Sequence, residues 1–289
     1  MFDVKDQICL PGKAVCEDAV GWGKTYLFAL DGASGLTGSH IMDGSSDAAW
    51  FAAGVRDGLC QALEGNSQKP TAAILEEILA GMRLEYRNRA DQLGAALPPD
   101  SPSAGIALFR EIGEEIEFFG LGDCVGMARL ADGSLFWSCD SALPALDDGV
   151  VARMAEIHQK TGATVLEARS QCGGLLLHNR TLKNTPGGYW ILDLSGIGLA
   201  HARVQRWKRG KVRSVSACSD GFGQLVSPFH LAEDYGKLHG RMMEEPLEEL
   251  TAALFAAQER DPDANRYPRL KFRDDICALW AQINQRAKE

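Results

Sequence analysis

The stretch Thr25–Gly32 (TYLFALDG) joins a run of β-forming residues directly to an acidic residue and a glycine. A similar run, Val212–Cys218 (VRSVSAC), leads into Ser219-Asp220-Gly221, and Ile276–Ile283 (ICALWAQI) follows Asp274-Asp275. Runs that are rich in β-formers and punctuated at their ends are typical of strands. The acidic residues are therefore expected at strand ends, at the mouth of a sheet.

A further acidic pair, Glu17-Asp18, lies near the beginning of the chain. Carboxylates at the mouth of a sheet are costly to leave unpaired. Several of them converging from distant parts of the chain indicate a hard divalent cation, because oxygen ligands and a tolerance for bound water are what Mg²⁺ and Mn²⁺ require.

The composition is that of an ordinary soluble protein, with 289 residues of which 45% are apolar and 24% charged. The formal net charge of −9 argues against nucleic acid as the main partner, because such binding depends on an excess of Lys and Arg. No window approaches the ~18 consecutive apolar residues of a membrane span, and the N-terminus (MFDVKDQICLPGK) lacks the form of a signal peptide. These features predict a cytoplasmic protein with no nucleic-acid or membrane partner.

The eight cysteines are scattered, and no two of them form a C-x-x-C pair. Most lie within apolar runs, where a reduced cysteine behaves as a small hydrophobic residue. The pattern therefore favours packing over a zinc site or disulfides.

Strands and helices are expected in separate blocks along the chain. Residues 1–30 are expected to form two strands around Pro11-Gly12, followed by helices at Ser45–Leu63 and Ala72–Leu93. The later expected elements are strands at Ile106–Arg110, Glu117–Leu121, Val125–Leu130 and Ser134–Cys139, a helix at Leu247–Glu259 and a strand at Ile276–Ile283. This order predicts an α+β fold, because the strands and helices of a doubly wound sheet would alternate.

Residues 141–190 are less regular than the rest of the chain. One helix is expected there, at Gly149–Thr161, among several Gly and Asn positions. We expect this segment to be a mobile flap within a single domain that spans residues 1–289.

The basic run Arg203–Arg213 (RVQRWKRGKVR) stands out in an acidic chain. It either docks an acidic or phosphorylated partner or forms a solvated hairpin tip between two strands. The hairpin is the simpler interpretation, because Lys208-Arg209-Gly210-Lys211 is a natural exposed turn.

Five acidic motifs follow one another along the chain. They are Lys13-x-x-x-Glu17-Asp18-Ala19, Asp31-Gly32, Gly122-Asp123, Ser219-Asp220-Gly221 and Asp274-Asp275-Ile276. This series resembles that of the metal-dependent protein phosphatases of the PP2C type, in which the usual run is R-x-x-x-E-D, D-G-x-x-G, G-D-S, S-D-G and D-N-I. Each motif alone is weak, but the match keeps the family order over nearly the whole chain.

The resemblance implies an αββα sandwich, in which two central, mostly antiparallel sheets are flanked by helices and hold two Mn²⁺ or Mg²⁺ ions in the cleft between them. Two such ions can share a water, lower its pKa and neutralise a phosphoryl group during in-line attack, so that no protein nucleophile is needed. The resemblance also implies roles for individual residues: Asp31 as the bridging ligand, the Gly32 carbonyl, Asp220 and Asp274 for the first ion, Glu17 for the second, Asp123 with Asp220 for a weak third ion, Lys13 for the phosphate and Asp18 for orienting metal-bound waters.

Three positions depart from the family pattern. Lys13 stands where the family commonly has an arginine, which replaces a bidentate fork with a point charge. Ala33 stands where some members have a histidine proposed as general acid, and Gln224 stands in place of a second carboxylate after Ser-Asp-Gly. His40, in the loop Ser34–Ser46, is either a replacement acid or a solvated loop residue, and only its proximity in sequence to Asp31 supports the first role.

The expected function is metal-dependent hydrolysis of phosphoserine and phosphothreonine monoesters in proteins. The implied partners are a phosphorylated protein substrate and a serine/threonine kinase. Two alternatives stay open: a catalytically weak or inactive module that keeps the fold and binds a phosphoprotein, and a phosphatase of a small phosphorylated metabolite.

Overall fold

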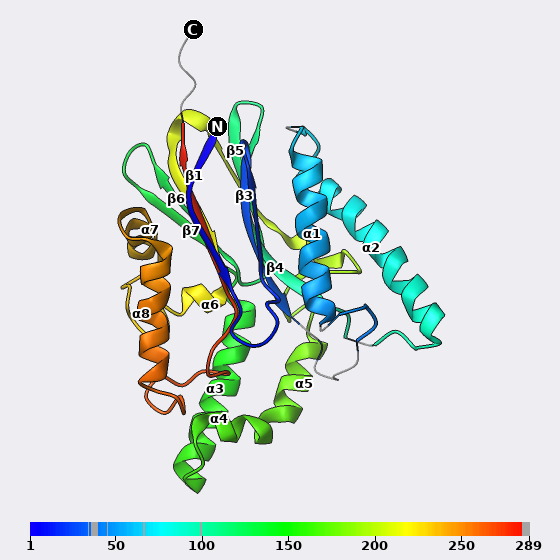
Figure 1. The fold of residues 1–289 in the computed structure, drawn as a ribbon, viewed down its shortest axis with the longest axis vertical. Coiled ribbons are helices and arrows are strands. Elements are labelled where there is room, and N and C mark those ends of the chain that lie inside the picture. The colour runs from blue at the N-terminus through cyan, green and yellow to red at the C-terminus, as the bar shows by residue number, and fades with distance from the viewer. Residues whose placement is uncertain (34, 36–39, 45, 66, 99, 285–289) are drawn as a thin grey trace.

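Two antiparallel sheets lie face to face between two layers of helices (Figure 1). The computed structural model describes the chain apart from residues 34, 36–39, 45, 66, 99 and 285–289. The first sheet has the order β1 (Phe2–Leu10), β11 (Ile276–Ile283), β10 (Val212–Cys218), β6 (Val125–Leu130) and β7 (Leu135–Ser138). The second has the order β2 (Ala19–Gly23), β3 (Tyr26–Ala33), β4 (Ser103–Ile112), β5 (Glu115–Leu121) and β9 (Arg203–Lys208), with β8 (Leu192–Asp193) paired to β4. The predicted α+β sandwich is confirmed.

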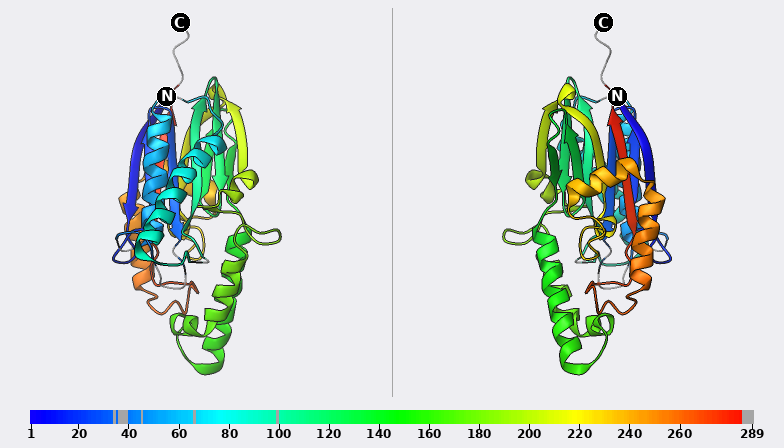
Figure 2. Two further views of the ribbon diagram at one scale, coloured as in Figure 1. Left: turned by 90° about the vertical axis from the view of Figure 1, so that its right-hand side faces the viewer. Right: turned by 90° about the vertical axis from the view of Figure 1, so that its left-hand side faces the viewer.

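The helices form two covering layers and a third group at one end of the sandwich. The second sheet is covered by α1 (Asp47–Leu63) and α2 (Thr71–Leu93), and the first by α7 (Tyr235–Glu244) and α8 (Leu247–Glu259). The third group consists of α3 (Ala142–Thr161), α4 (Val165–Ala168) and α5 (Gly173–Thr181), and it extends beyond the sheets at the end opposite the N-terminus (Figure 2). None of the helices in the described residues is both long and apolar enough to span a membrane.

Strand β3 shows how the sequence produces the layers. Its side chains alternate between the two faces of the sheet, as in any strand. Leu27 and Ala29 pack between the two sheets, whereas Phe28 and Leu30 pack under α1 and α2. All four are fully buried, so both faces of this strand are core, which explains its uninterrupted apolar run.

Two short hairpins confirm the turn signals in the sequence. Strands β4 and β5 pair around Gly113, and β6 and β7 pair around Asp132-Gly133. Gly113 and Gly133 have φ angles of 59° and 87°, which glycine adopts without a steric penalty. Asp132 is a turn residue there, and its Oδ1 accepts from Ser134 N–H over 3.0 Å.

The prediction of two strands within residues 1–30 was wrong. The structure has three, because β2 is a separate five-residue strand that pairs with β3 in the second sheet. Strand β1 belongs to the first sheet, where it pairs with β11. The segment between β1 and β2 therefore crosses from one sheet to the other, and it carries Lys13, Glu17 and Asp18.

Residues 141–190 are more helical than predicted. Helix α3 begins at Ala142 rather than at Gly149, and α4 and α5 follow it. The glycines misled the sequence interpretation: Gly149 lies within α3, and Gly173 and Gly174 begin α5, where the first turn lacks intrahelical partners in any case. A small apolar cluster of Val150, Met154, Ile157, Val165, Ala168, Cys172 and Ala264 packs these helices against the loop after α8.

The prediction of a solvated hairpin tip at Lys208–Lys211 was also wrong. Strand β9 lies at the edge of the second sheet beside β5, whereas β10 lies inside the first sheet, so the two do not pair. The short turn between them connects the sheets. Arg209 is buried there, and its Nη2 lies 3.2 Å from Oε2 of the buried Glu111.

Candidate metal centre

Three carboxylates meet where the two sheets end. Asp31 lies near the end of β3, Asp123 follows β5 after one glycine, and Asp220 follows β10 after Ser219. Their candidate ligand oxygens all lie within 4.8 Å of one another, and in the described part of the chain they form the one group with metal-ligand spacing. The Asp220 N–H donates to Asp31 Oδ2 over 3.3 Å, which ties the two sheets together at this point.

Burial and mutual repulsion raise the pKa values of all three carboxyl groups. For Asp31, burial is the main cause, followed by the charge of Asp220, and its pKa lies well above the ordinary range. For Asp123, burial and Asp220 raise the pKa to about 8. Burial and Asp274 raise the pKa of Asp220 as well. The cluster thus carries more acidic groups than it can hold in charged form without a cation.

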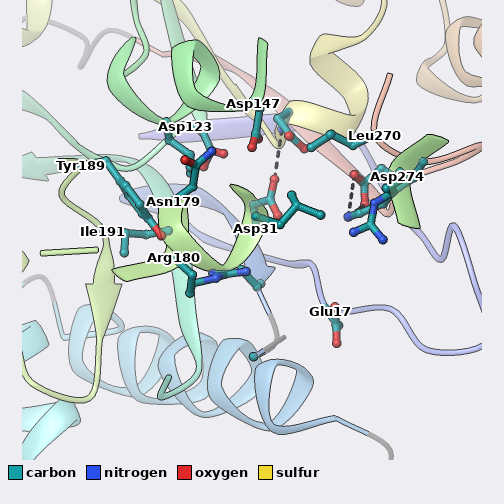
Figure 3. A pocket seen from close by; sticks show the side chains of 18 of the residues that line it. Glu17, Asp31, Asp123, Asp147, Asn179, Arg180, Tyr189, Ile191, Leu270 and Asp274 are labelled. Carbon is teal, nitrogen blue, oxygen red and sulfur yellow. Dashed lines mark hydrogen bonds and ion pairs between the residues drawn. The ribbon is translucent and has the colours of Figure 1, made fainter. Parts of the chain in front are cut away.

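Two further predicted ligands line the same cavity but are each held by a lysine. Lys271 Nζ donates to both carboxylate oxygens of Asp274, over 2.7 and 2.9 Å. Lys13 Nζ donates to Glu17 Oε2 over 3.0 Å, and Ser46 Oγ donates to the other Glu17 oxygen. In Figure 3, Asp31 lies between Glu17 on one side and Asp123 on the other. The predicted ligands therefore divide into a central cluster of three carboxylates and two flanking carboxylates, each of which has its own lysine partner.

Asp18 is buried beside the cluster, with 8% of the residue exposed. Its Oδ2 has no hydrogen-bond partner among the described residues. Burial raises the pKa of Asp18 well above the ordinary range, although a hydrogen bond with Ser219 opposes this. An orphaned buried oxygen of this kind is costly unless water or an ion satisfies it.

Asp275 holds the segment between β1 and β2 in place. Its Oδ1 accepts from Gly12 N–H over 2.7 Å and its Oδ2 from Glu17 N–H over 2.8 Å. Because Asp274 is its neighbour, one short loop positions a candidate ligand and anchors the segment that carries Glu17.

The helices at the end of the sandwich supply cavity residues that the sequence interpretation missed. Asp147, from α3, lines the cavity with Asp123 and Asp220, and burial and the charge of Asp220 raise its pKa to about 7. Arg180, from α5, lies over the cavity with Nε 3.4 Å from Asp100 Oδ2 (Figure 3). Asp147-Asp148 has no motif around it, so only the tertiary structure reveals its role.

The three departures from the family pattern have different surroundings. Ala33 lines the cavity, as Lys13 does. Gln224 is engaged elsewhere, because its Oε1 accepts from Gln258 Nε2 over 3.1 Å. His40 is exposed and is not among the described residues that line the cavity, although part of its loop lies outside the described residues.

A family model described as protein phosphatase 2C matches residues 9–256 of the chain. No curated protein matches the chain in sequence. The match covers the segments around Glu17, Asp31, Asp123 and Asp220, while Asp274 lies beyond it and is brought to the cavity by the loop that precedes β11.

Solved structures of bacterial phosphatases have the same fold. The catalytic domain of the serine/threonine protein phosphatase PstP in complex with two manganese ions has a TM-score of 0.54 and 14% identity, over 99% of this chain and 100% of that one. PstP/Ppp of Mycobacterium tuberculosis gives 0.53 and 14%, over 99% of both chains. Stp1 of Staphylococcus aureus gives 0.53 and 11%, over 99% of this chain and 96% of that one. At such identities the likeness shows the fold alone.

Proposed function

The chain belongs to the protein phosphatase 2C family, and from that membership and its acidic cavity we propose that it hydrolyses phosphoserine and phosphothreonine monoesters in proteins with two Mn²⁺ or Mg²⁺ ions. The observation that carries the proposal is the convergence of Asp31, Asp123 and Asp220 within 4.8 Å. These residues come from three separate strand ends, and they stay ionised together near neutral pH only if a cation offsets their repulsion.

The residues of the cavity fit a hard divalent cation. Every candidate ligand offers oxygen, and none offers sulfur or imidazole nitrogen. The orphaned Oδ2 of Asp18 and the raised pKa values of the cluster both indicate a missing positive charge. The pKa of Lys271 also reflects the excess of negative charge in the cavity. Burial lowers this pKa, but the charges of Asp274 and Asp220 outweigh the burial and raise it.

In the proposed site, Asp31 would be shared by the two ions. The Gly32 carbonyl, Asp220 and Asp274 would hold the first ion, Glu17 would hold the second, and Asp123 with Asp220 would hold a weak third. Asp274 and Glu17 would give up their lysine partners when they hold an ion. When bound, the two ions supply positive charge that lowers the pKa of a water and neutralises the phosphoryl group.

The protein side chains position the reactants. Asp18 accepts hydrogen bonds from water beside the ions, because its free oxygen is buried at the cluster. Lys13, once Glu17 binds an ion, is free to donate to a phosphoryl oxygen. No side chain acts as a nucleophile in this scheme, so positioning and charge stabilisation account for most of the rate.

We assign α3, α4 and α5 to a flap subdomain, at about 141–190, within a single domain of 289 residues. Helix α5 is tied to α3 by Asn179, whose Nδ2 donates to the Leu146 carbonyl over 3.2 Å. Because Asp147, Arg169 and Arg180 line the cavity, the flap contributes one acidic and two basic side chains to the place where a phosphorylated substrate enters. A protein substrate also implies a serine/threonine kinase that acts on the same residue.

The test uses the purified chain with Mn²⁺, Mg²⁺ or a chelator, and phosphopeptides, an aryl phosphate and small phosphomonoesters as substrates. We expect phosphopeptide hydrolysis that needs the metal and that Asp31→Asn reduces by about two orders of magnitude or more. Asp132→Asn, which alters an acidic residue of the β6–β7 turn, is the matched control and should leave turnover unchanged.

Calorimetry with Mn²⁺ separates this function from the alternatives. Two binding sites together with phosphopeptide turnover support the proposal. Metal binding or phosphopeptide binding without turnover would identify a recognition module, and preference for small phosphomonoesters over phosphopeptides would identify a metabolite phosphatase.

A further inference from the structure

Two cysteines that the sequence separates meet beside the acidic cavity. Cys9, near the end of β1, and Cys16, in the segment between β1 and β2, have their Sγ atoms 3.7 Å apart. Both residues are half-buried. Both sulfurs also contact the same backbone atom, the Asp18 carbonyl oxygen, at 3.6 and 3.7 Å. No other pair of cysteines forms such a contact in the described part of the chain.

We infer that Cys9 and Cys16 are a modification site that peroxide oxidises to a reversible disulfide, and that this bond displaces the segment carrying Glu17 and Asp18. The two sulfurs face each other without an intervening side chain. A disulfide has an S–S distance of about 2.05 Å, so the sulfurs must approach by roughly 1.7 Å. That distance is within reach of a small movement of one segment.

Cys16 is the residue that moves when the disulfide forms. Cys9 is held in the ladder between β1 and β11, opposite Cys277. Cys16 lies outside any strand or helix, in the stretch that crosses between the sheets. The backbone around Cys9 therefore resists displacement, and the segment around Cys16 follows the new bond.

The reaction balances with hydrogen peroxide as the oxidant. One thiol, as its thiolate, attacks a peroxide oxygen, the O–O bond breaks, hydroxide leaves and a sulfenic acid forms. The second thiol attacks that sulfur, the S–S bond forms, and the hydroxyl group leaves as water once it takes up the proton. In total two electrons and two protons pass from the thiols to the peroxide, which becomes two molecules of water.

The disulfide closes a ring of residues 9–16 that Asp275 already holds. Asp275 accepts hydrogen bonds from Gly12 N–H inside the ring and from Glu17 N–H immediately after it. Moving Cys16 towards β1 strains the second of these bonds and shifts the Glu17 and Asp18 side chains. Only the consequence for metal binding and turnover rests on the proposed function, since the disulfide itself depends on the two sulfurs alone.

The chain offers a direct readout of the bond. Lys13 lies between the two cysteines, so trypsin separates residues 6–13 (DQICLPGK) from 14–24 (AVCEDAVGWGK). After peroxide treatment and alkylation of the remaining thiols, a non-reducing digest should contain these peptides joined, and dithiothreitol should release them. Unlinked peptides after oxidation of the folded protein would overturn the inference.

Variants and metal binding test the consequence. The oxidised wild-type protein should bind Mn²⁺ about tenfold more weakly than the reduced protein, with recovery on reduction. Cys9→Ser should remove both the linkage and this loss, whereas Cys60→Ser, at another half-buried cysteine, should keep both. A linked protein with unchanged Mn²⁺ affinity would overturn the proposed displacement. If the reduced protein binds no Mn²⁺, the proposed function fails, while the peptide linkage still decides the modification.

Discussion

Gly32 shows how closely the backbone is packed at the candidate metal centre. A Cβ atom at this position would lie 2.2 Å from the Glu17 carbonyl oxygen, which is far inside contact distance. The absence of a side chain therefore allows the end of β3 to lie against the segment that carries Glu17. This contact sets the position of Asp31, the shared ligand of the proposed site, relative to Glu17, the proposed ligand of the second ion.

Gly32→Ala should therefore weaken both metal binding and folding. The backbone must move away from Glu17, and we expect a loss of about 1–3 kcal/mol in the free energy of unfolding and about tenfold in Mn²⁺ affinity. Urea unfolding and calorimetry measure the two effects. Gly65→Ala is the control, because a Cβ there meets nothing within 4 Å. Unchanged Mn²⁺ affinity in Gly32→Ala would contradict the ligand role of its carbonyl.

Lys271 competes with a cation for Asp274. Its ammonium occupies both carboxylate oxygens, so an ion can bind Asp274 only after displacing it. Lys271→Met should raise Mn²⁺ affinity by about fivefold, the equivalent of a half-exposed ion pair of roughly 1 kcal/mol. Calorimetry at matched pH checks this. Weaker binding in the variant would indicate that the lysine orders Asp274 for the metal.

The order of motifs in the sequence was sufficient to find the central cluster. It was not sufficient to find Lys271, the basic partner of Asp274, or Asp147, which the flap contributes. Asp31 lies near the end of a strand, and Asp123 and Asp220 each follow one, so short-range sequence features are enough to locate them. Lys271 and Asp147 come from a loop and from a helix whose positions depend on packing at the end of the sandwich. Neither residue belongs to a sequence motif that would identify it as part of the site. The contact between Cys9 and Cys16 could not be predicted from a sequence motif either.

At the scale of elements, turn signals located the hairpins but could not assign strands to sheets. Strands β9 and β10 follow each other with a basic turn between them, as a hairpin would, yet they belong to different sheets. Both choices fit the local sequence, and in the structure Arg209 of this turn is buried beside Glu111 instead of lying in solvent. Helix α7 was not predicted, because it is only ten residues long and contains two glycines, Gly236 and Gly240.

Helix α7 is attached to the first sheet through a buried histidine. His239 Nε2 lies 2.8 Å from Ser214 Oγ and its Nδ1 lies 2.7 Å from Ser216 Oγ, both on β10. Burial, with a smaller contribution from Arg129, lowers the pKa of His239 to about 4. The unfolded chain, with a histidine pKa near 6.5, therefore binds this proton more readily than the folded protein.

The contribution of His239 to stability should fall as pH falls from about 6.5 towards 4, because the unfolded state takes up the proton of this residue first. Between pH 7.5 and 5 this residue alone should lower the free energy of unfolding by about 2 kcal/mol. His239→Gln removes this titration, so the difference in free energy of unfolding between the wild-type protein and the variant should shift by about that amount between the two pH values. Urea unfolding of both proteins at the two pH values is the measurement, and equal pH dependence would contradict the assignment.

At the scale of the whole molecule, the sandwich places strand ends from both sheets around one acidic cavity. Asp31 and Asp123 come from the second sheet, whereas Asp220 and Asp274 adjoin strands of the first. The central layers bury large apolar side chains on both faces of their strands, and this core holds the repelling carboxylates at a fixed separation. Metal affinity and folding stability are therefore coupled through the same groups.

This coupling predicts opposite effects of pH with and without metal. In the metal-free protein the pKa values of Asp123 and Asp147 are raised to about 8 and about 7, so the folded state binds protons that the unfolded state has released above its ordinary carboxyl pKa near 4. Stability of the metal-free protein should consequently fall as pH rises from 6 to 8. Divalent ions bind the deprotonated carboxylates, so their affinity should rise over the same interval with release of protons.

Thermal unfolding at pH 6 and pH 8, with a chelator or with Mn²⁺, tests both the fall in metal-free stability and the rise in metal affinity with pH. With chelator the midpoint temperature should be lower at pH 8, whereas the increase caused by Mn²⁺ should be larger there. Asp123→Asn should reduce both changes, because it removes one of the groups that exchange a proton for the ion. Calorimetry in two buffers of different ionisation enthalpy should show proton release near pH 7. Mn²⁺ affinity that is the same at both pH values, with no proton release, would show that the carboxylates of the cavity are not exchanging protons for the cation.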